Sequence, residues 1–192
     1  MADFPLEDID WAEGSDNTAG IQQTVYFIRK SDVVTFPPLP KLGDASVTTL
    51  ADLAIVPGDL VLKEGAKPTS FYCTLEKSGG TSESQGEMDG MSFKNGLKLF
   101  HPGNKATADG FARFAKNGSF YILYADLDGE VFLLGHPGYP AKMVSAPGTT
   151  GEKTADPKGR TFTFQSVWSG PTPRFTGNVL AGTVEQTLVF LA

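Results

Sequence analysis

Short segments in which apolar and polar residues alternate recur along the chain, and this alternation is typical of β-strands with one buried face. Residues 70–76 (SFYCTLE), 91–100 (MSFKNGLKLF) and 160–168 (RTFTFQSVW) follow this pattern. Residues 22–30 (QQTVYFIRK) and 119–125 (SFYILYA) are continuously rich in β-branched and aromatic side chains, which also favours strands. These segments predict a fold built mainly of β-structure.

Two further strands are predicted at residues 131–135 (VFLLG) and 183–191 (TVEQTLVFL). Segments 70–76 and 91–100 flank a polar stretch at residues 78–90, so they are expected to pair as a hairpin with a long mobile tip. A set of about eight short strands with frequent turns is typical of a β-sandwich or barrel. The predicted fold class is therefore all-β with one helix, in a sandwich or barrel.

The one predicted helix covers residues 107–117 (TADGFARFAKN), where apolar side chains recur at helical spacing. Thr107 is expected to cap its first turn, and Asn117-Gly118 is expected to end it in a left-handed conformation. The apolar face that this helix is expected to bury consists of Phe111, Phe114 and Ala115.

The chain is expected to divide into an extended N-terminal arm at residues 1–20 and a single domain at residues 21–192. The arm is polar and acidic, yet it carries Phe4, Ile9 and Trp11. A solvated tail seldom carries such apolar side chains, so we expect these three residues to contact another subunit. The alternative is that they complete the core of their own domain.

The composition argues against several classes of protein, namely nucleic-acid binders, disulfide-linked proteins, secreted proteins and membrane proteins. A net charge of −6 argues against a protein that grips nucleic acid through a basic patch. The single cysteine, Cys73, cannot form an internal disulfide, and its place on the apolar face of its strand predicts a core residue. The N-terminus lacks the basic and apolar regions of a signal peptide, and no stretch approaches the roughly 20 apolar residues of a membrane span. We therefore expect a protein that folds in the cytoplasm and has no membrane partner.

Candidate chemistry is sparse. The two histidines, His101 and His136, each precede a Pro-Gly pair, and neither stands in a metal-ligand spacing. Asp126, Asp128 and Glu130 could offer oxygen ligands to a cation. However, an Asp-Gly pair between apolar strands is typical of a hairpin turn, with Asp128 capping the bend, and we favour that interpretation. No metal, no cofactor and no enzymatic activity are expected.

Four segments in a fixed order carry a resemblance to a known family. They are residues 92–103 (SFKNGLKLFHPG), 108–118 (ADGFARFAKNG), 120–143 (FYILYADLDGEVFLLGHPGYPAKM) and 150–177 (TGEKTADPKGRTFTFQSVWSGPTPRFTG). Their succession resembles the tail tube (major tail) proteins of long-tailed bacteriophages. The resemblance implies a β-sandwich with a flanking helix, related to type VI secretion tube proteins, with six copies in a ring and rings stacked into a tube.

The same resemblance implies a place in the virion tail, assembly in the host cytoplasm and contacts with other tail proteins. It also implies an arm that bridges rings, no catalytic residue, and a lumen through which DNA passes without specific binding. Acidic groups would suit such a lumen because they repel phosphates. The candidate lumen or loop acids are Glu76, Glu83, Glu87, Asp89 and Glu185.

Two alternatives remain open at this point. The first is another virion component, namely a tail terminator, a neck protein or a capsid decoration protein. The second is a carbohydrate-binding β-sandwich, which requires exposed aromatic side chains. Its candidates are Trp11, Tyr139 and Trp168.

Overall fold

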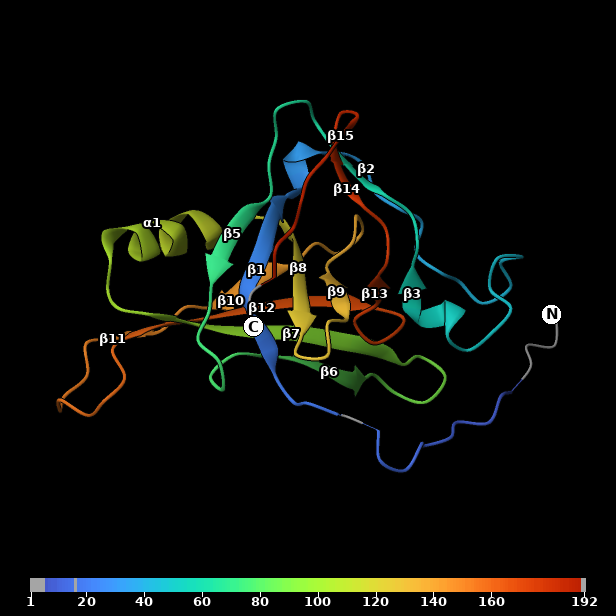
Figure 1. Cartoon of the computed structure of the whole chain (residues 1–192), viewed down its shortest axis with the longest axis horizontal. Helices are drawn as coiled ribbons and strands as arrows, with labels where there is room; N and C mark the ends of the chain where they lie inside the picture. Colours follow the sequence, from blue (N-terminus) through green and yellow to red (C-terminus); the bar gives the residue numbers. More distant parts are fainter. Residues whose placement is uncertain (1–5, 16, 191–192) are drawn as a thin grey trace.

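The computed structural model describes residues 6–15 and 17–190. Among them it contains fifteen β-strands in three sheets, one α-helix and two short 3₁₀ helices (Figure 1). The predicted all-β class with one helix is therefore confirmed in outline. The sheets stack as layers of a sandwich, and none of them closes into a barrel within the described residues.

The central sheet has six strands in the order β3-β13-β9-β8-β1-β5. Its core is the antiparallel pair of β1 and β8, and β9 returns from β8 through a tight turn. The bounds of its strands are β1 Ile21–Arg29, β3 Ile55–Val56, β5 Thr69–Tyr72, β8 Phe120–Asp126, β9 Val131–Leu134 and β13 Arg174–Phe175.

A lower sheet and an upper sheet, named by their places in Figure 1, cover the two faces of the central sheet. The lower sheet runs β10-β12-β7-β6, with β11 attached to β12, and the upper sheet runs β15-β14-β4-β2. The bounds in the lower sheet are β6 Gly79–Gln85, β7 Ser92–Pro102, β10 Lys142–Ser145, β11 Gly148–Thr149 and β12 Gly159–Trp168. The bounds in the upper sheet are β2 Val33–Thr35, β4 Leu60–Leu62, β14 Val179–Ala181 and β15 Val184–Glu185.

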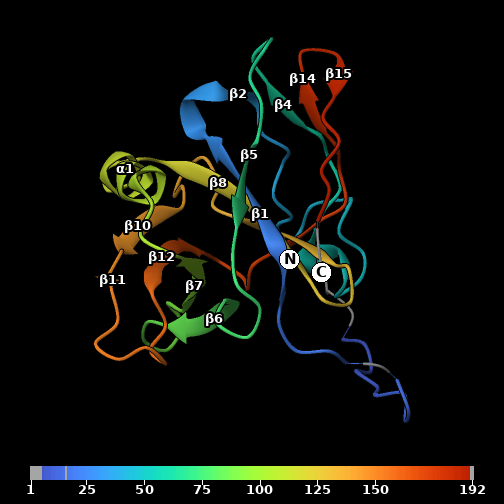
Figure 2. The ribbon, with the colours of Figure 1, turned by 60° about the vertical axis from the view of Figure 1, so that its left-hand side comes forward.

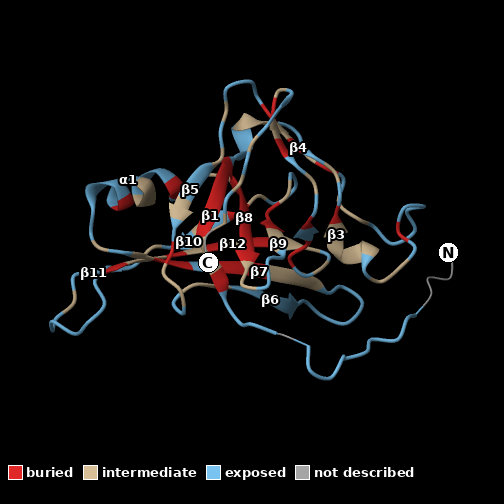
Figure 3. Ribbon diagram, viewed as in Figure 1, coloured by how far each residue is buried: buried red, intermediate tan, exposed pale blue. Residues whose placement is uncertain are grey.

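The three-layer stack explains why β1 and β8 are continuously apolar. Val25 and Phe27 on β1 point into the core shared with the lower sheet, whereas Tyr26 and Ile28 point into the core shared with the upper sheet. Figure 3 shows both strands as buried along most of their length. A strand with two buried faces needs apolar residues at every position, so it loses the alternation of a half-buried strand.

Phenylalanine dominates the core between the central and lower sheets. The ring of Phe27 lies edge-on to those of Phe71, Phe111, Phe120 and Phe164, with centroids 5.0 to 5.7 Å apart. Such edge-to-face pairs add to the free energy gained by burying the rings. Cys73 is buried in the same core, as predicted.

The helix α1 covers Ala106–Ala115, close to its predicted range, but its ends differ from the prediction. The residue before its first turn is Lys105, and no side chain caps that turn, so the predicted cap at Thr107 is wrong. Gly118 has no positive φ, so the predicted left-handed end is wrong as well. Its close approach to the ring of Phe120 gives another physical reason for a glycine at this position.

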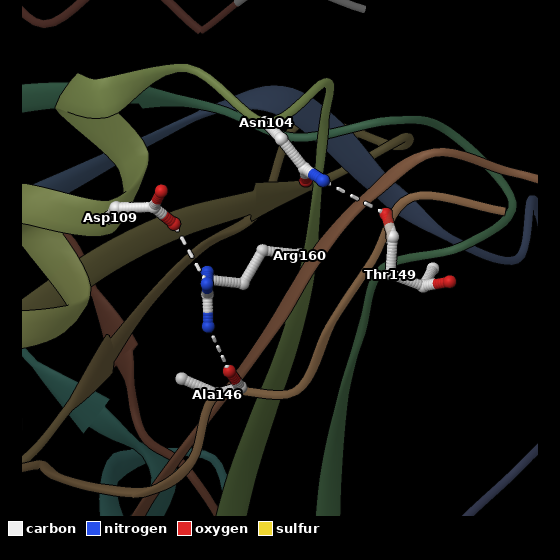
Figure 4. Close-up of polar contacts among 5 residues, drawn as sticks. All are labelled: Asn104, Asp109, Ala146, Thr149 and Arg160. Atoms are coloured by element: carbon white, nitrogen blue, oxygen red, sulfur yellow. Dashed lines mark hydrogen bonds and ion pairs between the residues drawn. The ribbon is translucent and has the colours of Figure 1, made fainter.

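The predicted apolar face of α1 is only partly buried. Ala115 is buried and Phe111 packs against the core, but Phe114 is 55 % exposed. The helix is held against the lower sheet by Arg160, which reaches from β12 to Asp109 on α1 with an Nη2–Oδ1 distance of 2.7 Å (Figure 4). The other terminal nitrogen of Arg160 donates to the carbonyl oxygen of Ala146, so one side chain fixes both the helix and the neighbouring loop.

The predicted hairpin between segments 70–76 and 91–100 is wrong. β5 pairs with β1, and β7 pairs with β6, whose sequence GGTSESQ was expected to be a mobile tip. A strand without apolar residues has little β-propensity of its own, and β6 forms because β7 supplies a pairing partner along its whole length. The actual tip of this hairpin is confined to residues 86–91.

The predicted strand at residues 183–191 is mostly irregular up to Phe190, and within this described part only Val184–Glu185 form β15; Leu191 lies outside the described residues. The segment after it folds back over the central sheet. The hydroxyl of Tyr26 donates to the carbonyl oxygen of Val189 at 2.9 Å and accepts from its N–H at 2.8 Å. Leu188 and Phe190 pack against the core shared with the upper sheet.

Candidate functional site

The described part of the N-terminal arm, residues 6–15 and 17–20, projects from the start of β1 as an irregular segment (Figures 1 and 2). Its apolar side chains lie in solvent, with exposed fractions of 91 % for Leu6, 90 % for Ile9 and 67 % for Trp11. Phe4, the other predicted contact residue, lies outside the described residues. The described apolar residues of the arm therefore do not complete the core of their own domain.

Within the described residues, a few exposed hydrogen bonds join the arm to its own domain. The N–H of Leu50 donates to Oε2 of Glu7 at 3.2 Å, and the N–H of Thr18 lies 3.3 Å from both carboxylate oxygens of Asp128. Each of these contacts is exposed. Residues 6–13 (LEDIDWAE) also carry four acidic side chains and no basic one, so this segment combines strong negative charge with free apolar surface.

A hollow of about 510 Å³ lies at the opposite end of β1, where the chain passes into the 3₁₀ helix Lys30–Asp32 beside the end of α1. Most of its wall is apolar, and the exposed ring of Phe114 contributes to it, 6.1 Å from the ring of Phe120. The lining residues are Arg29, Lys30, Ser31, Phe114, Gly118, Ser119 and Phe120.

The charged groups at this hollow are mainly cationic. Arg29 forms an ion pair with Asp32 through Nε at 2.8 Å, but its side chain is 58 % exposed. Nζ of Lys30 donates to the carbonyl oxygen of Pro137, and Nζ of Lys142 donates to the hydroxyl of Ser119, each at 2.7 Å. These two ammonium groups bind neutral oxygens, so their charge is not neutralised by those contacts. The hollow therefore offers an apolar floor with a positive rim.

Sequence reasoning missed this hollow because it assigned Phe114 to the buried face of the helix. The sequence around Phe114 carries the signal, because this residue stands between Arg113 and Lys116. An aromatic residue flanked by cations on a short helix is consistent with the edge of the buried face, where the ring remains accessible.

The predicted turn at residues 126–130 is confirmed, although its details differ. β8 and β9 pair across it, and Gly129 adopts a positive φ of 94°. Asp126, and not Asp128, caps the bend, because its Oδ1 accepts the N–H of Glu130 at 2.8 Å. The carboxylate of Glu130 pairs with Nε of Arg174 at 2.7 Å. Each acid of this turn thus has its own protein partner. In the described part of the chain, no group of three or more His, Cys, Asp or Glu side chains is placed to hold a metal ion.

The predicted lumen or loop acids do not form one cluster. Glu83 lies on β6 opposite Lys94 of β7, and Glu87 and Asp89 lie at the exposed tip that follows β6. Glu76 is exposed before the other end of β6, and Glu185 lies on β15 of the upper sheet. The structure therefore brings three of the five acids to one end of the lower sheet.

Strand β6 forms an edge of the lower sheet. It pairs with β7 along its whole length, while its other side pairs with no strand among the described residues. Nearly all of its residues are exposed, and none is apolar apart from its glycines. An edge of this length has free backbone N–H and C=O groups that can pair with a strand of another chain.

Burial keeps the thiol of Cys73 and the phenol of Tyr124 in their neutral forms. Burial raises the pKa of the Cys73 thiol, which disfavours the thiolate needed by a nucleophile. Burial also raises the pKa of Tyr124 to about 12. Nδ1 of His101 lies 2.9 Å from the carbonyl oxygen of Tyr72, and Nε2 of His136 lies 3.0 Å from that of Val167, so each ring holds backbone together.

The three aromatic residues of the carbohydrate-binding alternative lie on different elements. Trp11 is on the arm, Trp168 ends β12 and is half-buried, and Tyr139 lies in the loop after β9. Nε1 of Trp168 donates to the carbonyl oxygen of Pro171 at 2.7 Å, which turns this ring toward its own chain. No two of these three rings are in contact in the described structure.

No helix in the described part of the chain is both long enough and apolar enough to cross a membrane. Comparison with known proteins found no matching family model, no matching curated protein and no matching solved structure. The function of the chain is therefore inferred from its own surfaces.

Proposed function

We propose that this protein is a structural subunit that associates with copies of itself and forms the tail tube of a long-tailed bacteriophage. The single observation that carries the proposal is the projecting arm, whose Leu6, Ile9 and Trp11 are exposed. Three large apolar side chains on one short segment are costly to leave in water, and contact with a partner removes that cost.

The open edge of β6 supports lateral association of the same subunits. Its seven residues present one unpaired row of backbone groups without an apolar side chain that would promote unspecific aggregation. Pairing with a strand of a neighbouring copy would extend the lower sheet from subunit to subunit. A lateral contact that closes on itself gives a ring, and an axial contact that repeats gives a stack of rings.

The charge of the chain suits a passage for DNA. Each copy carries a net charge of −6, and ring symmetry multiplies this charge around a central channel. Glu83 lies on β6 and Glu87 and Asp89 lie at the tip that follows it, where these acids would repel phosphates and keep DNA from binding. The proposal assigns no catalytic role, and it places the protein in the virion tail after assembly in the host cytoplasm, in contact with other tail proteins.

Electron microscopy of the purified protein tests this proposal. Negative-stain images over a range of protein concentrations are expected to show rings with a central channel, and stacks of these rings at the higher concentrations. Sedimentation velocity on the same samples should show species much larger than the 20.5 kDa chain. A protein that sediments as a monomer at every concentration and forms no rings would contradict the proposal, and rings that never stack would favour a terminator or neck protein.

A further inference from the structure

The arm and the hollow around Phe114 lie at opposite ends of the same strand. The arm joins β1 at Ile21, and the hollow begins where β1 ends at Arg29. At about 3.3 Å per residue, the nine residues of β1 separate these two points by roughly 26 Å. Figures 1 and 2 agree that the arm runs away from the side of the molecule that carries α1.

The two features are complementary in chemistry. Residues 6–13 present Leu6, Ile9 and Trp11 together with four carboxylates. The hollow presents an apolar wall around Phe114 and a rim with Arg29 and Lys30. The acid at the rim, Asp32, is paired with Arg29 and does not cancel the charge of Lys30 or of the nearby Lys142.

We propose that the hollow around Phe114 receives residues 6–13 of the arm from a second copy of this chain. This inference rests on the proposed self-association and names the surface that accepts the arm. Because donor and acceptor lie at opposite ends of β1, each copy that receives an arm still offers its own, and the contact repeats head to tail with β1 pointing along the direction of growth.

The arm of the same copy is not a suitable occupant of the hollow. It leaves the domain at the far end of β1, and its Glu7 is held at Leu50. Returning to the hollow would require the arm to reverse direction and cross the length of the domain. A second copy can deliver the same residues from outside without such a reversal.

A peptide-binding experiment tests the proposed contact. The probe is a fluorescein-labelled peptide with residues 6–15 (LEDIDWAEGS). The receptor is the full chain carrying Leu6→Ser, Ile9→Ser and Trp11→Ser, so that its own arm does not compete. Fluorescence anisotropy should show saturable binding that weakens as salt is added, because screening reduces the attraction between exposed charges.

Matched substitutions in the receptor locate the binding site. Phe114→Ala should weaken peptide binding by about tenfold or more, because an exposed aromatic ring at the centre of a contact contributes much of its free energy. Lys30→Glu should also weaken peptide binding, because it replaces a cation at the rim of the hollow by an acid. Lys30 is exposed, so this substitution leaves the core unchanged. The control is Val184→Ala, which removes a side chain of similar exposure on β15, outside the hollow, and should leave binding unchanged. Circular dichroism and thermal unfolding check that each variant keeps its fold.

A peptide in which all four acids are replaced by their amides gives a second control and should bind more weakly than the acidic peptide. Failure to bind the acidic peptide, or equal binding by Phe114→Ala and Val184→Ala, would overturn the inference. If rings and stacks still form in that case, the proposed function stands and the arm docks elsewhere. If the peptide binds at the hollow but the full chain remains a monomer, the hollow accepts an acidic apolar segment of a different protein, and both the second-copy assignment and the tube proposal are wrong.

Discussion

The two terminal segments of this chain are both irregular and both carry apolar side chains, but they differ in where those side chains lie. Leu188 and Phe190 near the C-terminus pack on the core beneath the upper sheet. Leu6 and Ile9 near the N-terminus are almost fully exposed. Apolar content alone therefore does not decide whether a terminal segment folds onto its own domain.

Charge and polar partners explain the difference. Residues 186–190 (QTLVF) carry no charge, and Tyr26 satisfies both backbone groups of Val189. Residues 6–13 carry four acids, and burying them against the same domain would remove these carboxylates from water without cationic partners. The C-terminal segment is thus suited to its own domain, whereas the arm needs a partner with a cationic rim.

Removing the C-terminal segment should have the largest effect on stability. A chain that ends at Glu185 loses the packing of Leu188 and Phe190 and leaves the Tyr26 hydroxyl without its backbone partners. We expect the free energy of unfolding to fall by about 3 kcal/mol or more, measured by urea denaturation. An unchanged free energy of unfolding would show that this segment is not part of the core.

Removing one hydroxyl should have a smaller effect. Tyr26→Phe keeps the ring that lies edge-on to Phe190 but breaks both hydrogen bonds to Val189. The free energy of unfolding should fall by about 1 kcal/mol, because Val189 is half-exposed and water can replace part of what is lost. Hydrogen exchange should become faster at Val189, and an unchanged rate there would contradict the proposed attachment.

The acid titration of Asp52 reports on whether the arm binds its own domain, because Asp52 lies two residues after Leu50, which the arm contacts through Glu7. The backbone N–H groups of Thr48 and Thr49 lower the pKa of Asp52 from 3.8 to about 2. A lowered pKa means that Asp52 stabilises the fold above its ordinary value near pH 4, and that this contribution is lost as the pH falls toward 2. Carbon NMR should find a midpoint near pH 2 both with and without the arm. A shift on arm deletion would show that the arm binds its own domain tightly.

Several parts of the fold could be predicted from the sequence, and each has a local cause. The ranges of β1 and β8 follow from their β-branched and aromatic runs, and the turn between β8 and β9 follows from Asp-Gly. The range of α1 follows from its helical spacing of apolar residues. These features depend on residues that are close in sequence.

The misplaced caps of α1 and of the β8–β9 turn are local errors, whereas the larger errors concern features that depend on distant residues. β5 pairs with β1 instead of β7, and the polar β6 becomes a strand because β7 lies beside it. The exposure of Phe114 depends on how Arg160 holds α1 against the lower sheet, which the helical spacing of apolar residues does not reveal. The candidate site shows the same division, since the arm was predicted from its own composition but the hollow at the other end of β1 was not.

Deletion of residues 1–16 separates folding from assembly, with the free energy of unfolding and the assembly state measured on the same sample. The remaining chain should unfold within about 0.5 kcal/mol of the full chain, because the described part of the arm makes only exposed polar hydrogen bonds to its domain. It should also fail to form stacked rings in sedimentation and electron microscopy, while the full chain forms them. Stacks that persist after the deletion, or a loss of stability comparable to that of the C-terminal truncation, would contradict the account.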